Sequence, residues 1–383
     1  MKWEKVEYND VLEKIIGGGT PSKTVSDYWN GDIPWCSVKD MVGDKYQLYS
    51  TEDTITHSGL ENSSTNLIQA GTVITSTRMG LGRAFINKVD MAINQDLKAL
   101  IPNEKIDNKF LLWSIVNKKE EIEGLGIGST VKGIRLDVLR RLKINLPPLP
   151  IQRRIASILS AYDDLIENNL KRIKLLEEKA FLRYKQIVRE EQLAKYILSD
   201  FGDIITGKTP STSIADYFGD DVPFIKTPDM HNQIFIEHTD QMLSELGAKS
   251  QEKKLLPPLS LCVSCIGTAG VVGITSKPSQ TNQQINSIVF YEPKNAYFFY
   301  SLMSQMKEQL DALGSNGSTF TNVNKNKFEN MEVFIPYHKV LNEFAEEFEA
   351  PFSLILTLQK QNAKLREARD ILLPRLINGQ IEV

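Results

Sequence analysis

Features typical of secreted, membrane-spanning or metal-binding proteins are scarce in this sequence of 383 residues. It contains three cysteines, Cys36, Cys262 and Cys265, an odd number that argues against a disulfide framework. No apolar run approaches the roughly 18 residues of a membrane-spanning helix and no signal peptide is recognisable, so we expect a cytoplasmic protein. The net charge is −3, so the chain also lacks the excess of basic residues that is typical of proteins that bind nucleic acid unaided.

Arginine is absent from residues 192–336, where 11 lysines stand against 15 acidic side chains. Two-pronged guanidinium contacts to guanine are therefore not available in this part of the chain. If the chain binds DNA, this region must use lysine, amide or backbone groups. Another component must then neutralise much of the phosphate charge.

Glycine and proline are absent from residues 151–191, a length that is unusual for a loop and typical of a long helix. Apolar side chains recur there at steps of three and four residues, which places them in one narrow stripe. The stripe predicts a coiled-coil seam that includes Ile155, Ile158, Tyr162, Leu165, Ile173 and Leu176. At ~1.5 Å per residue the helix would span roughly 60 Å, more than a compact domain needs, so its stripe requires a partner.

A fainter copy of this pattern, from about residue 340 to residue 376, offers that partner. Its stripe includes Phe344, Phe348, Ile355, Leu358, Leu365 and Leu372. Two such helices, each unable to bury its own stripe, predict an intramolecular antiparallel coiled coil. Pro351 lies inside the second helix and removes a backbone donor, so we expect a kink or a break there.

The long helices are part of an internal repeat that covers the whole chain. The repeated segments include Thr-Pro-Ser at 20–22 and 209–211, Asn-Gln at 94–95 and 282–283, and Gly-Ser-Thr at 128–130 and 317–319. Their offsets, 188 or 189 residues, are almost half of the chain length. A fixed order of motifs with small compensating insertions and deletions indicates a duplication.

The repeat predicts an α/β (α+β) fold with two similar globular domains, two long helices and a pseudo-twofold relation between the halves. The globular parts have the pattern of short strands and turns. One helix is expected to begin near residue 108, with an echo from about 296 to 313. The expected parts are 1–147, 148–194, 195–336 and 337–383.

No motif in the sequence signals a catalytic centre or a metal site. The CxxC pair at 262–265 has no second pair to complete a zinc site. Asp229 with the Glu-x-Lys of residues 252–254 imitates a Mg²⁺-dependent nuclease motif, but the first half keeps Asp40 and lacks the Glu-x-Lys. The two aspartates are therefore expected to share a structural role. We predict a non-catalytic chain that holds no metal or cofactor of its own.

In order and spacing these motifs resemble the specificity subunit of type I restriction–modification systems over essentially the whole chain. The resemblance rests on the duplicated Gly-x-Thr-Pro-Ser loop, the Ile/Val-Pro-aromatic segment and the Asn-Gln pair. Its most specific part is Leu-Pro-Pro-Leu-Pro-Ile-Gln-Arg-Arg-Ile-Ala at 146–156, followed by the first long helix. The Leu-Ile-Asn-Gly-Gln-Ile at 376–381 is also similar to the C-terminus of that family.

The resemblance implies that each globular part is a target recognition domain that reads one half of a bipartite DNA site. It implies that the coiled coil sets the distance between the half-sites and docks two methyltransferase (modification) subunits, which would bring S-adenosylmethionine. A translocating restriction endonuclease subunit could join this complex, whereas the chain itself would be non-catalytic. A coiled-coil adaptor without DNA readout is the rival hypothesis, and a band-shift assay with the methyltransferase present would separate the two.

The two globular parts differ where loops are expected to meet bases, since Arg78 corresponds to Ile266 and Arg83 to Val271. Unlike side chains read unlike base edges, so we expect different half-sites and a target that is not palindromic. Candidate DNA contacts are Lys23, Arg78, Arg83, Gln95 and Lys132 in the first part and Lys208, Lys226, Gln283 and Thr321 in the second. Residues kept in both parts are expected to be architectural; these pairs are Thr20 and Thr209, Asn94 and Asn282, and, in the core, Trp35 and Phe224.

Overall fold

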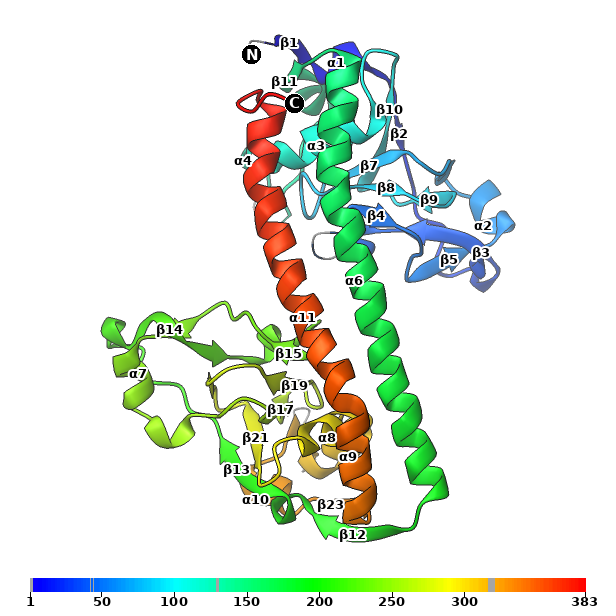
Figure 1. The fold of residues 1–383 in the computed structure, drawn as a ribbon. Coiled ribbons are helices and arrows are strands. Elements are labelled where there is room, and N and C mark those ends of the chain that lie inside the picture. Colours follow the sequence, from blue (N-terminus) through cyan, green and yellow to red (C-terminus); the bar gives the residue numbers. More distant parts are fainter. Residues whose placement is uncertain (1–2, 42, 44, 129–130, 316–320) are drawn as a thin grey trace. The chain divides into compact units, whose positions relative to one another are not determined.

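The structure, a computed structural model, describes residues 3–41, 43, 45–128, 131–315 and 321–383. It consists of two compact units, both drawn in Figure 1. Unit 1 comprises the chain up to Ile166 together with Leu365–Val383, and unit 2 comprises Glu167–Lys364. Most of the repeated Gly-Ser-Thr segments lies outside the described residues. The two long helices contribute residues to both units, and each unit is considered by itself.

Unit 1 contains short helices, short strands and part of each long helix. Its helices are α1 (Tyr8–Val11), η1 (Ser26–Tyr28), η2 (Val38–Asp40), α2 (His57–Glu61), α3 (Asn108–Asn117), α4 (Lys119–Gly124), α5 (Leu136–Arg141), the first part of α6 (Leu149–Glu190) and the last part of α11 (His338–Ile377). Its strands are β1 (Glu4–Glu7), β2 (Leu12–Gly17), β3 (Trp29–Cys36), β4 (Gln47–Leu48), β5 (Asp53–Ile55), β6 (Asn66–Ile68), β7 (Val73–Ser76), β8 (Ala84–Asn87), β9 (Met91–Ile93), β10 (Leu97–Pro102) and β11 (Lys143–Leu146). Helix α3 lies where the sequence predicted one.

Two sheets form the globular part of unit 1. The larger has the strand order β2-β10-β7-β8-β4, and the smaller has the order β5-β3-β9-β6. Strands β7 and β8 are buried along their whole length, including the polar residues at their C-terminal ends. The two-residue strand β4 pairs in parallel with β8 and forms one edge of the larger sheet. A separate antiparallel pair, β1 with β11, leads into α6.

Unit 2 repeats this series of elements. Its helices are η3 (Leu198–Asp200), η4 (Ala215–Tyr217), η5 (Thr227–Met230), α7 (Glu245–Lys249), η6 (Glu252–Lys254), α8 (Asn295–Met303), α9 (Lys307–Gly314) and α10 (Lys325–Glu329), with the remaining parts of α6 and α11. Its strands are β12 (Leu193–Ile197), β13 (Gly202–Thr206), β14 (Phe218–Ile225), β15 (Phe235–Ile236), β16 (Met242–Leu243), β17 (Leu261–Ser264), β18 (Ile266–Gly267), β19 (Val272–Thr275), β20 (Gln280–Thr281), β21 (Ile285–Phe290), β22 (Thr321–Asn322) and β23 (Glu332–Pro336).

The larger sheet of unit 2 has the order β13-β21-β17-β19-β15, which reproduces that of unit 1 strand for strand. The two-residue strand β15 joins β19 in parallel, just as β4 joins β8. The pair β12 with β23 leads into α11, as β1 with β11 leads into α6. The duplicated sequence thus produces the same larger sheet twice, whereas the smaller sheet of unit 2 has the order β16-β14-β20 and β18 pairs separately with β22.

The start of α6 is fixed by the buried side chain of Gln152, within the most specific sequence motif. Its Nε2 donates to the carbonyl oxygens of Pro147 (2.8 Å) and Lys105 (2.9 Å), and its Oε1 accepts from the N–H of Asp107 (2.7 Å). The Asp107 carboxylate in turn caps α3, accepting from the N–H of Phe110 at 3.1 Å. One buried amide therefore joins the first turns of two helices, and buried backbone groups need such partners.

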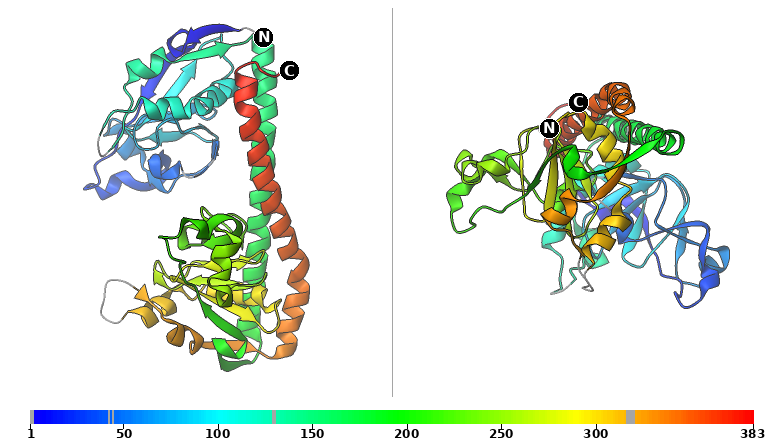
Figure 2. Two further views of the ribbon diagram at one scale, coloured as in Figure 1. Left: turned by 90° about the vertical axis from the view of Figure 1, so that its left-hand side faces the viewer. Right: turned by 90° about the horizontal axis from the view of Figure 1, so that it is seen from below.

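In unit 1, the segments of α6 and α11 lie side by side, as both views of the ribbon show (Figures 1 and 2). Ile155 of α6 is fully buried in one cluster with Leu373 and Leu376 of α11, and Ile158 and Leu372 pack against that cluster. This seam joins the core of α3 and the larger sheet, so the helix pair and the globular part share one hydrophobic core.

A buried ion pair crosses the two helices in unit 1. The guanidinium group of Arg369, whose side chain is 1% exposed, donates to Asp163 Oδ1 at 2.7 Å and to Asp370 Oδ1 at 2.9 Å. The same group lies 4.8 Å from the centre of the Tyr46 ring. Burial raises the pKa of the Asp163 carboxyl to about 6, although Arg369 acts in the opposite direction. Arg369 thus contacts both α6 and the residue that precedes strand β4.

In unit 2, the two helices run in opposite directions. Asn169 Nδ2 donates to Asn362 Oδ1 at 2.9 Å, and Arg183 Nε lies 3.2 Å from Glu347 Oε2. The partner number falls as the α6 number rises, which is the antiparallel arrangement that the sequence predicted. Asn169 and Asn362 are both buried, so they form a polar layer within an apolar seam.

Aromatic residues of α11 pack on helix α8 as well as on α6. The ring of Phe344 lies 5.3 Å from Phe298 and 4.4 Å from Phe348, and the ring of Phe352 lies 4.6 Å from Tyr297. The predicted stripe of the second helix therefore packs into a hydrophobic core that α6, α8 and α11 share, and does not form a seam with α6 alone.

The predicted seam positions differ in burial. Ile155, Phe344, Phe348, Ile355 and Leu358 are buried, whereas Ile158, Tyr162, Ile173, Leu176, Leu365 and Leu372 are partly buried. Leu165 is 53% exposed, and its neighbour Ile166 is buried, so the prediction that Leu165 lies in the seam is wrong by one residue. A stripe with steps of three and four leaves this choice open where two apolar residues are adjacent.

Helix α11 is continuous from His338 to Ile377, so the break that Pro351 predicted does not occur. Phe348 and Phe352 are fully buried on either side of the proline. Burying each of these side chains contributes about 2 kcal/mol, which offsets the ~3 kcal/mol that an internal proline costs a helix. None of the described helices combines the length and apolarity that a membrane crossing requires.

Candidate nucleic-acid interface

One exposed feature has the same geometry in both units: a threonine hydroxyl bound to a glutamine side chain. Thr20 Oγ1 donates to Gln95 Oε1 at 2.6 Å, and Thr209 Oγ1 donates to Gln283 Oε1 at 2.6 Å. Both glutamines are exposed. The hydrogen bond joins the Gly-x-Thr-Pro-Ser loop to the Asn-Gln turn in each unit, although the two segments are more than 70 residues apart.

The loop and the turn also touch through their backbones. A Cβ atom added at Gly18 would lie 1.9 Å from the carbonyl oxygen of Ile93, and one added at Gly207 would lie 2.1 Å from that of Asn282. Only glycine permits this approach, which explains its place in the repeated motif. In unit 1 the buried Trp35 adds a hydrogen bond from its Nε1 to the loop at 3.0 Å.

The asparagines of the two Asn-Gln turns have the architectural role predicted for them. Asn94 Oδ1 accepts from the N–H of Asp96 at 3.1 Å, and Asn282 Oδ1 accepts from that of Gln284 at 3.1 Å. Both asparagines are buried. Each side chain thus takes the place of a backbone carbonyl in a tight turn.

Asp40 and Asp229 also share a structural role, as the repeat predicted. Each carboxylate accepts one hydrogen bond from the N–H three residues earlier (2.8 Å in both) and another from an N–H 12 or 11 residues later (2.7 and 2.9 Å). Among the described residues, no three His, Cys, Asp or Glu side chains are grouped as a metal site would require. The three cysteines are free and buried.

Two basic candidates of unit 1, Arg78 and Lys132, are brought together by the chain. Arg78 forms an isolated backbone bridge with Gly133, and the N–H of Met79 donates to the carbonyl oxygen of Lys132 at 3.4 Å. Both side chains are exposed. Their backbones are adjacent although the two segments are more than 50 residues apart in the sequence.

A third candidate, Arg83, is exposed but already makes one hydrogen bond within the protein. Its Nη1 donates to the carbonyl oxygen of Met41 at 2.6 Å. It lines a cavity of about 100 Å³ together with Lys45 and Lys119. Asp40 also lines this cavity, so the three cations leave an excess of positive charge, which favours an anion such as phosphate.

The lysine candidates of the two units lie near aromatic rings. Lys23 Nζ is 6.0 Å from the centre of the Trp29 ring, and Lys226 Nζ is 5.8 Å from that of the Phe224 ring. Phe224 is fully buried, as predicted for a core residue. Lys23 is exposed, whereas Lys226 is half-buried.

The two remaining candidates of unit 2, Lys208 and Thr321, differ in exposure and in side-chain hydrogen bonding. Lys208 is exposed, and only its backbone is held, through an N–H bond to Thr281 at 2.9 Å. Thr321 is half-buried, and its hydroxyl donates to Asp311 Oδ1 at 2.9 Å. That hydroxyl can therefore accept from a ligand but has already used its proton.

One cation near the duplicated pair did not emerge from the sequence. Lys98 Nζ donates to the carbonyl oxygens of Gln95 (2.5 Å) and Leu97 (3.0 Å). Its half-burial in β10 lowers the pKa of the ammonium group. A single lysine in a strand has no pattern that distinguishes it from a solvated one, so sequence reasoning missed it.

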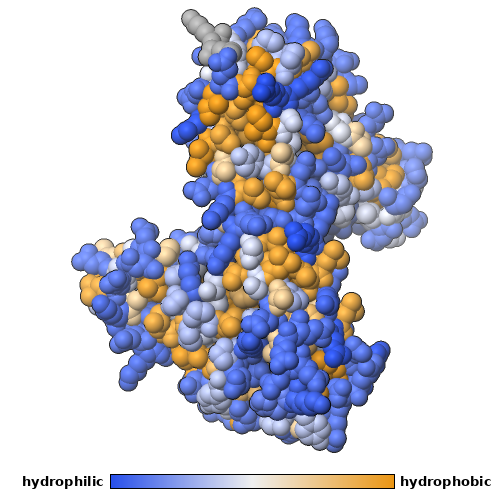
Figure 3. All heavy atoms as spheres, in the orientation of Figure 1, coloured by the Kyte–Doolittle hydropathy of each residue, from blue (hydrophilic) through white to orange (hydrophobic). Residues whose placement is uncertain are grey.

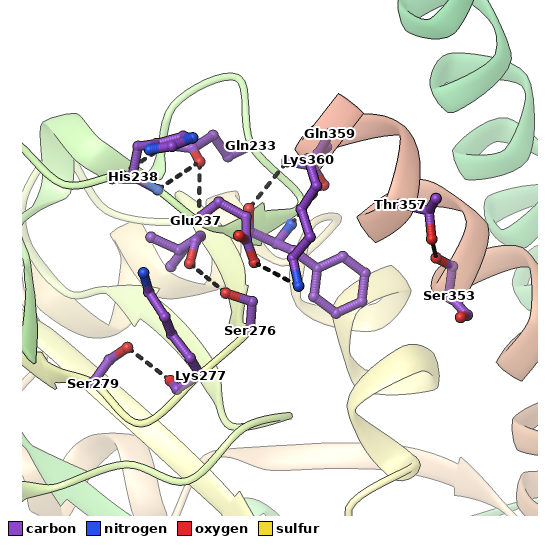
Figure 4. Close-up of polar contacts among 12 residues, drawn as sticks. Gln233, Glu237, His238, Ser276, Lys277, Ser279, Ser353, Thr357, Gln359 and Lys360 are labelled. Atoms are coloured by element: carbon purple, nitrogen blue, oxygen red, sulfur yellow. Dashed lines mark hydrogen bonds and ion pairs between the residues drawn. The ribbon is translucent and has the colours of Figure 1, made fainter. Parts of the chain in front are cut away.

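In unit 2, polar residues of α11 hold the edge of the larger sheet (Figure 4). Gln359 Oε1 accepts from the N–H of Phe235 at 3.1 Å, and Gln359 Nε2 donates to the carbonyl oxygen of the same residue at 3.0 Å. Lys360 Nζ lies 3.8 Å from the Glu237 carboxylate. The glutamine amide pairs with β15 as a further strand would, which covers the edge.

The matching edge in unit 1 is held by different residues. Gln47 of β4 donates through Nε2 to Asp164 Oδ1 of α6 at 2.8 Å. The neighbouring Tyr46 ring lies against Arg369 of α11. In each unit the edge strand of the larger sheet is therefore fixed to a long helix, by contacts that join residues more than 100 positions apart.

Large apolar residues remain exposed on α6. Leu175 is 64% exposed and Leu182 is 68% exposed. They are seven residues apart and lie on one side of the helix. Figure 3 shows further hydrophobic residues gathered in patches among hydrophilic ones on the drawn face of each unit. Exposed apolar patches of this kind commonly mark protein interaction surfaces.

Comparison with known proteins places these features in a family. A family model described as the type I restriction modification DNA specificity domain matches residues 1–178 and again residues 190–365. The type I restriction enzyme HindI specificity subunit of Haemophilus influenzae is 47% identical over 48% of this chain and 40% of its own length. The chain thus spans less than half of that relative.

Two further relatives correspond to almost the whole chain. The type I restriction enzyme MjaIX specificity subunit of Methanocaldococcus jannaschii is 28% identical over 100% of this chain and 94% of its own length. The crystal structure of a type I restriction–modification S subunit from M. genitalium superposes on 98% of this chain and 96% of its own, with a TM-score of 0.59 and 15% identity. That similarity establishes a shared fold.

Proposed function

This chain belongs to the family of type I restriction modification DNA specificity domains, and from that membership we propose that it is the DNA sequence-specificity subunit of such a system. Each of the two globular parts, 1–147 and 195–336, reads one half of a bipartite, non-palindromic DNA site. The observation that carries this proposal is one larger-sheet topology built twice with unlike side chains at corresponding positions, such as the exposed Arg78 against the half-buried Ile266. Unlike side chains on one scaffold suit unlike half-sites.

The helical parts, 148–194 and 337–383, would set the spacing between the half-sites. Support comes from the polar layer of Asn169 with Asn362, because a buried polar pair penalises every shifted register of two paired helices. Arg369 and Asp163 restrict the register in unit 1 by the same principle. A fixed register gives a fixed helix length between two readers.

The chain would work with partners rather than alone. Its net charge of −3 suits a protein whose methyltransferase subunits, two per complex, supply much of the phosphate neutralisation and carry S-adenosylmethionine. The exposed Leu175 and Leu182 are candidates for docking them. A restriction subunit would join the same complex in the cytoplasm, and the specificity subunit would remain non-catalytic.

Mapping methylated bases in the source genome, with and without this gene, tests the proposal. We expect one bipartite motif with two unlike halves to lose its methylation when the gene is deleted. In the purified methyltransferase complex, Arg78→Ala should relax selection within one half-site and leave the other unchanged. A genome whose methylation is unaffected by the deletion would contradict the proposal and favour the adaptor hypothesis.

The docking surface has its own test. The double variant Leu175→Glu and Leu182→Glu should prevent co-elution with the methyltransferase, because two carboxylates would enter an apolar contact. Leu67, which is 44% exposed in unit 1, provides a matched control, and Leu67→Glu should leave co-elution unchanged. Equal effects of the two changes would show that the α6 surface has no special role.

A further inference from the structure

The Thr–Gln pair is an exposed hydrogen bond between side chains of distant segments that both units keep, and this sets it apart from the other candidate DNA contacts. Arg78 and Arg83 have no arginine counterparts in unit 2, and neither Lys23 nor Lys132 has a lysine counterpart there. A side chain that reads bases should differ between readers of different half-sites. A polar group that is kept in both units must either hold the fold together or meet something that both half-sites share.

The fold does not depend on this hydrogen bond. In unit 1 the loop is already held by a bond from the N–H of Gly19 to Ile93 at 3.0 Å, and in unit 2 by one from Lys208 to Thr281 at 2.9 Å. The close glycine contacts add a second constraint in each unit. An exposed hydrogen bond between two neutral side chains contributes ~1 kcal/mol at most to such a junction.

The hydrogen bond instead orients the glutamine amide. Oε1 of each glutamine accepts a hydrogen bond from the threonine hydroxyl, which leaves the two N–H donors of Nε2 for other partners. No described residue accepts a hydrogen bond from Nε2 of Gln95 or Gln283. An adenine edge needs both an acceptor and a donor from one amide. A phosphate oxygen needs only donors.

Each unit also has a lysine beside the pair, at a different position in the sequence. In unit 1 Lys98 Nζ binds the backbone oxygen of Gln95 itself. In unit 2 the exposed Lys208 directly precedes Thr209. The cation recurs although its residue does not, which is the pattern expected where charge matters and base identity does not.

We infer that each unit carries a sequence-independent phosphate-binding point, formed by the side-chain amide of Gln95 or Gln283 and held in place by the hydroxyl of Thr20 or Thr209. This inference rests on the proposed function, since it names the part of the DNA that the duplicated pair contacts. The DNA backbone is the one feature that two unlike half-sites present in the same geometry.

The test uses the full chain in complex with its methyltransferase subunits and two duplexes, one with the mapped site and one with both half-sites scrambled. Gln95→Leu and Gln283→Leu remove the donors, and Gln95→Glu and Gln283→Glu place a carboxylate against phosphate. We expect each leucine variant to lower the affinity for both duplexes by the same factor, about threefold to tenfold. Each glutamate variant should lower the affinity for both duplexes further. The two sites should act multiplicatively when combined.

Gln69→Glu in unit 1 and Gln309→Glu in unit 2 change exposed glutamines elsewhere and should leave the affinity within about twofold. An unchanged affinity, a loss confined to the mapped duplex, a loss of methyltransferase assembly without DNA, or a fall in melting temperature without a change in binding would each overturn the inference. The wild-type complex provides a separate result, because equal affinity for both duplexes would refute the proposed function itself.

Discussion

Replacing Arg369 with methionine should destabilise unit 1 by about 2–3 kcal/mol at pH 7. The guanidinium group is fully buried and binds Asp163 and Asp370, and methionine fills much of its volume without its charge. Removing one partner of a buried ion pair usually costs ~3–5 kcal/mol, because the other charge is left buried without compensation. The structure predicts a smaller loss here.

The reason is that Asp163 can escape by taking up a proton. Burial already raises the pKa of its carboxyl to about 6, so protonating it at pH 7 adds only ~1.4 kcal/mol, one pKa unit. The lost charged hydrogen bond and the lost contact with the Tyr46 ring add ~1–2 kcal/mol. At pH 5 the carboxyl is protonated in either protein, so the loss should shrink by about 1 kcal/mol.

Tryptophan fluorescence offers an assay that is selective for this unit. The four tryptophans of the chain, Trp3, Trp29, Trp35 and Trp113, all belong to unit 1. Urea unfolding followed by their emission therefore reports unit 1, whereas far-ultraviolet circular dichroism reports the whole chain. The free energy of unfolding would be measured at pH 5 and at pH 7 for wild type and variant.

Two comparisons make the result interpretable. Arg375→Met changes an exposed arginine of the same helix and should alter the free energy by less than ~0.5 kcal/mol. The double variant Asp163→Asn with Arg369→Met removes the stranded carboxyl and should recover at least 1 kcal/mol. A loss below ~1 kcal/mol at pH 7, or an equal loss at both pH values, would refute the reasoning.

Three further perturbations test other contacts. Because the pKa of Asp163 is raised, protonation of its carboxyl stabilises the folded state below the unfolded pKa of ~3.9, and this stabilisation is lost as the pH rises through 6. Asp163→Asn should remove this part of the pH dependence of the unit 1 melting temperature. Gln359→Leu should speed hydrogen exchange at β15 by leaving two backbone groups unpaired, without moving the tryptophan-detected transition, and the exposed Gln361→Leu should do neither. Asp229→Ala should cost ~1–3 kcal/mol in unit 2, measured by circular dichroism, and added Mg²⁺ should not alter that cost.

The strongest sequence signals were local or periodic ones. The run without glycine and proline predicted a helix over 151–191, and the structure has one from Leu149 to Glu190. The second helix was expected from about 340 to 376 and spans His338–Ile377. Long amphipathic runs determine their own secondary structure, and a duplication allows each half to check the other. The shared role of Asp40 and Asp229 was predicted in this way.

The contacts that fix the sheets to the helices could not be predicted in the same way. Strand β15 has only two residues, and Gln359 lies 124 positions away on what the sequence presents as a solvated helix face. A polar residue on a helix has the same local pattern whether it faces water or a sheet edge. The choice between Leu165 and Ile166 has the same cause, because only the packed partner distinguishes two adjacent apolar residues.

The duplication also provides an internal control on which contacts are free to change. The edge of the larger sheet is fixed by Gln47 and Asp164 in unit 1 but by Gln359 and a strand backbone in unit 2. A contact that only holds two parts of one protein together can be made by any complementary groups, and here it has diverged. The exposed Thr–Gln contact has kept both its residues and its 2.6 Å geometry. Internal contacts such as those of Asp40 and Asp229 are also kept, but they satisfy backbone N–H groups that would otherwise lack a partner. The Thr–Gln bond joins two exposed side chains beside backbone contacts that already hold the loop, so its constancy supports a role toward an external group that both units meet.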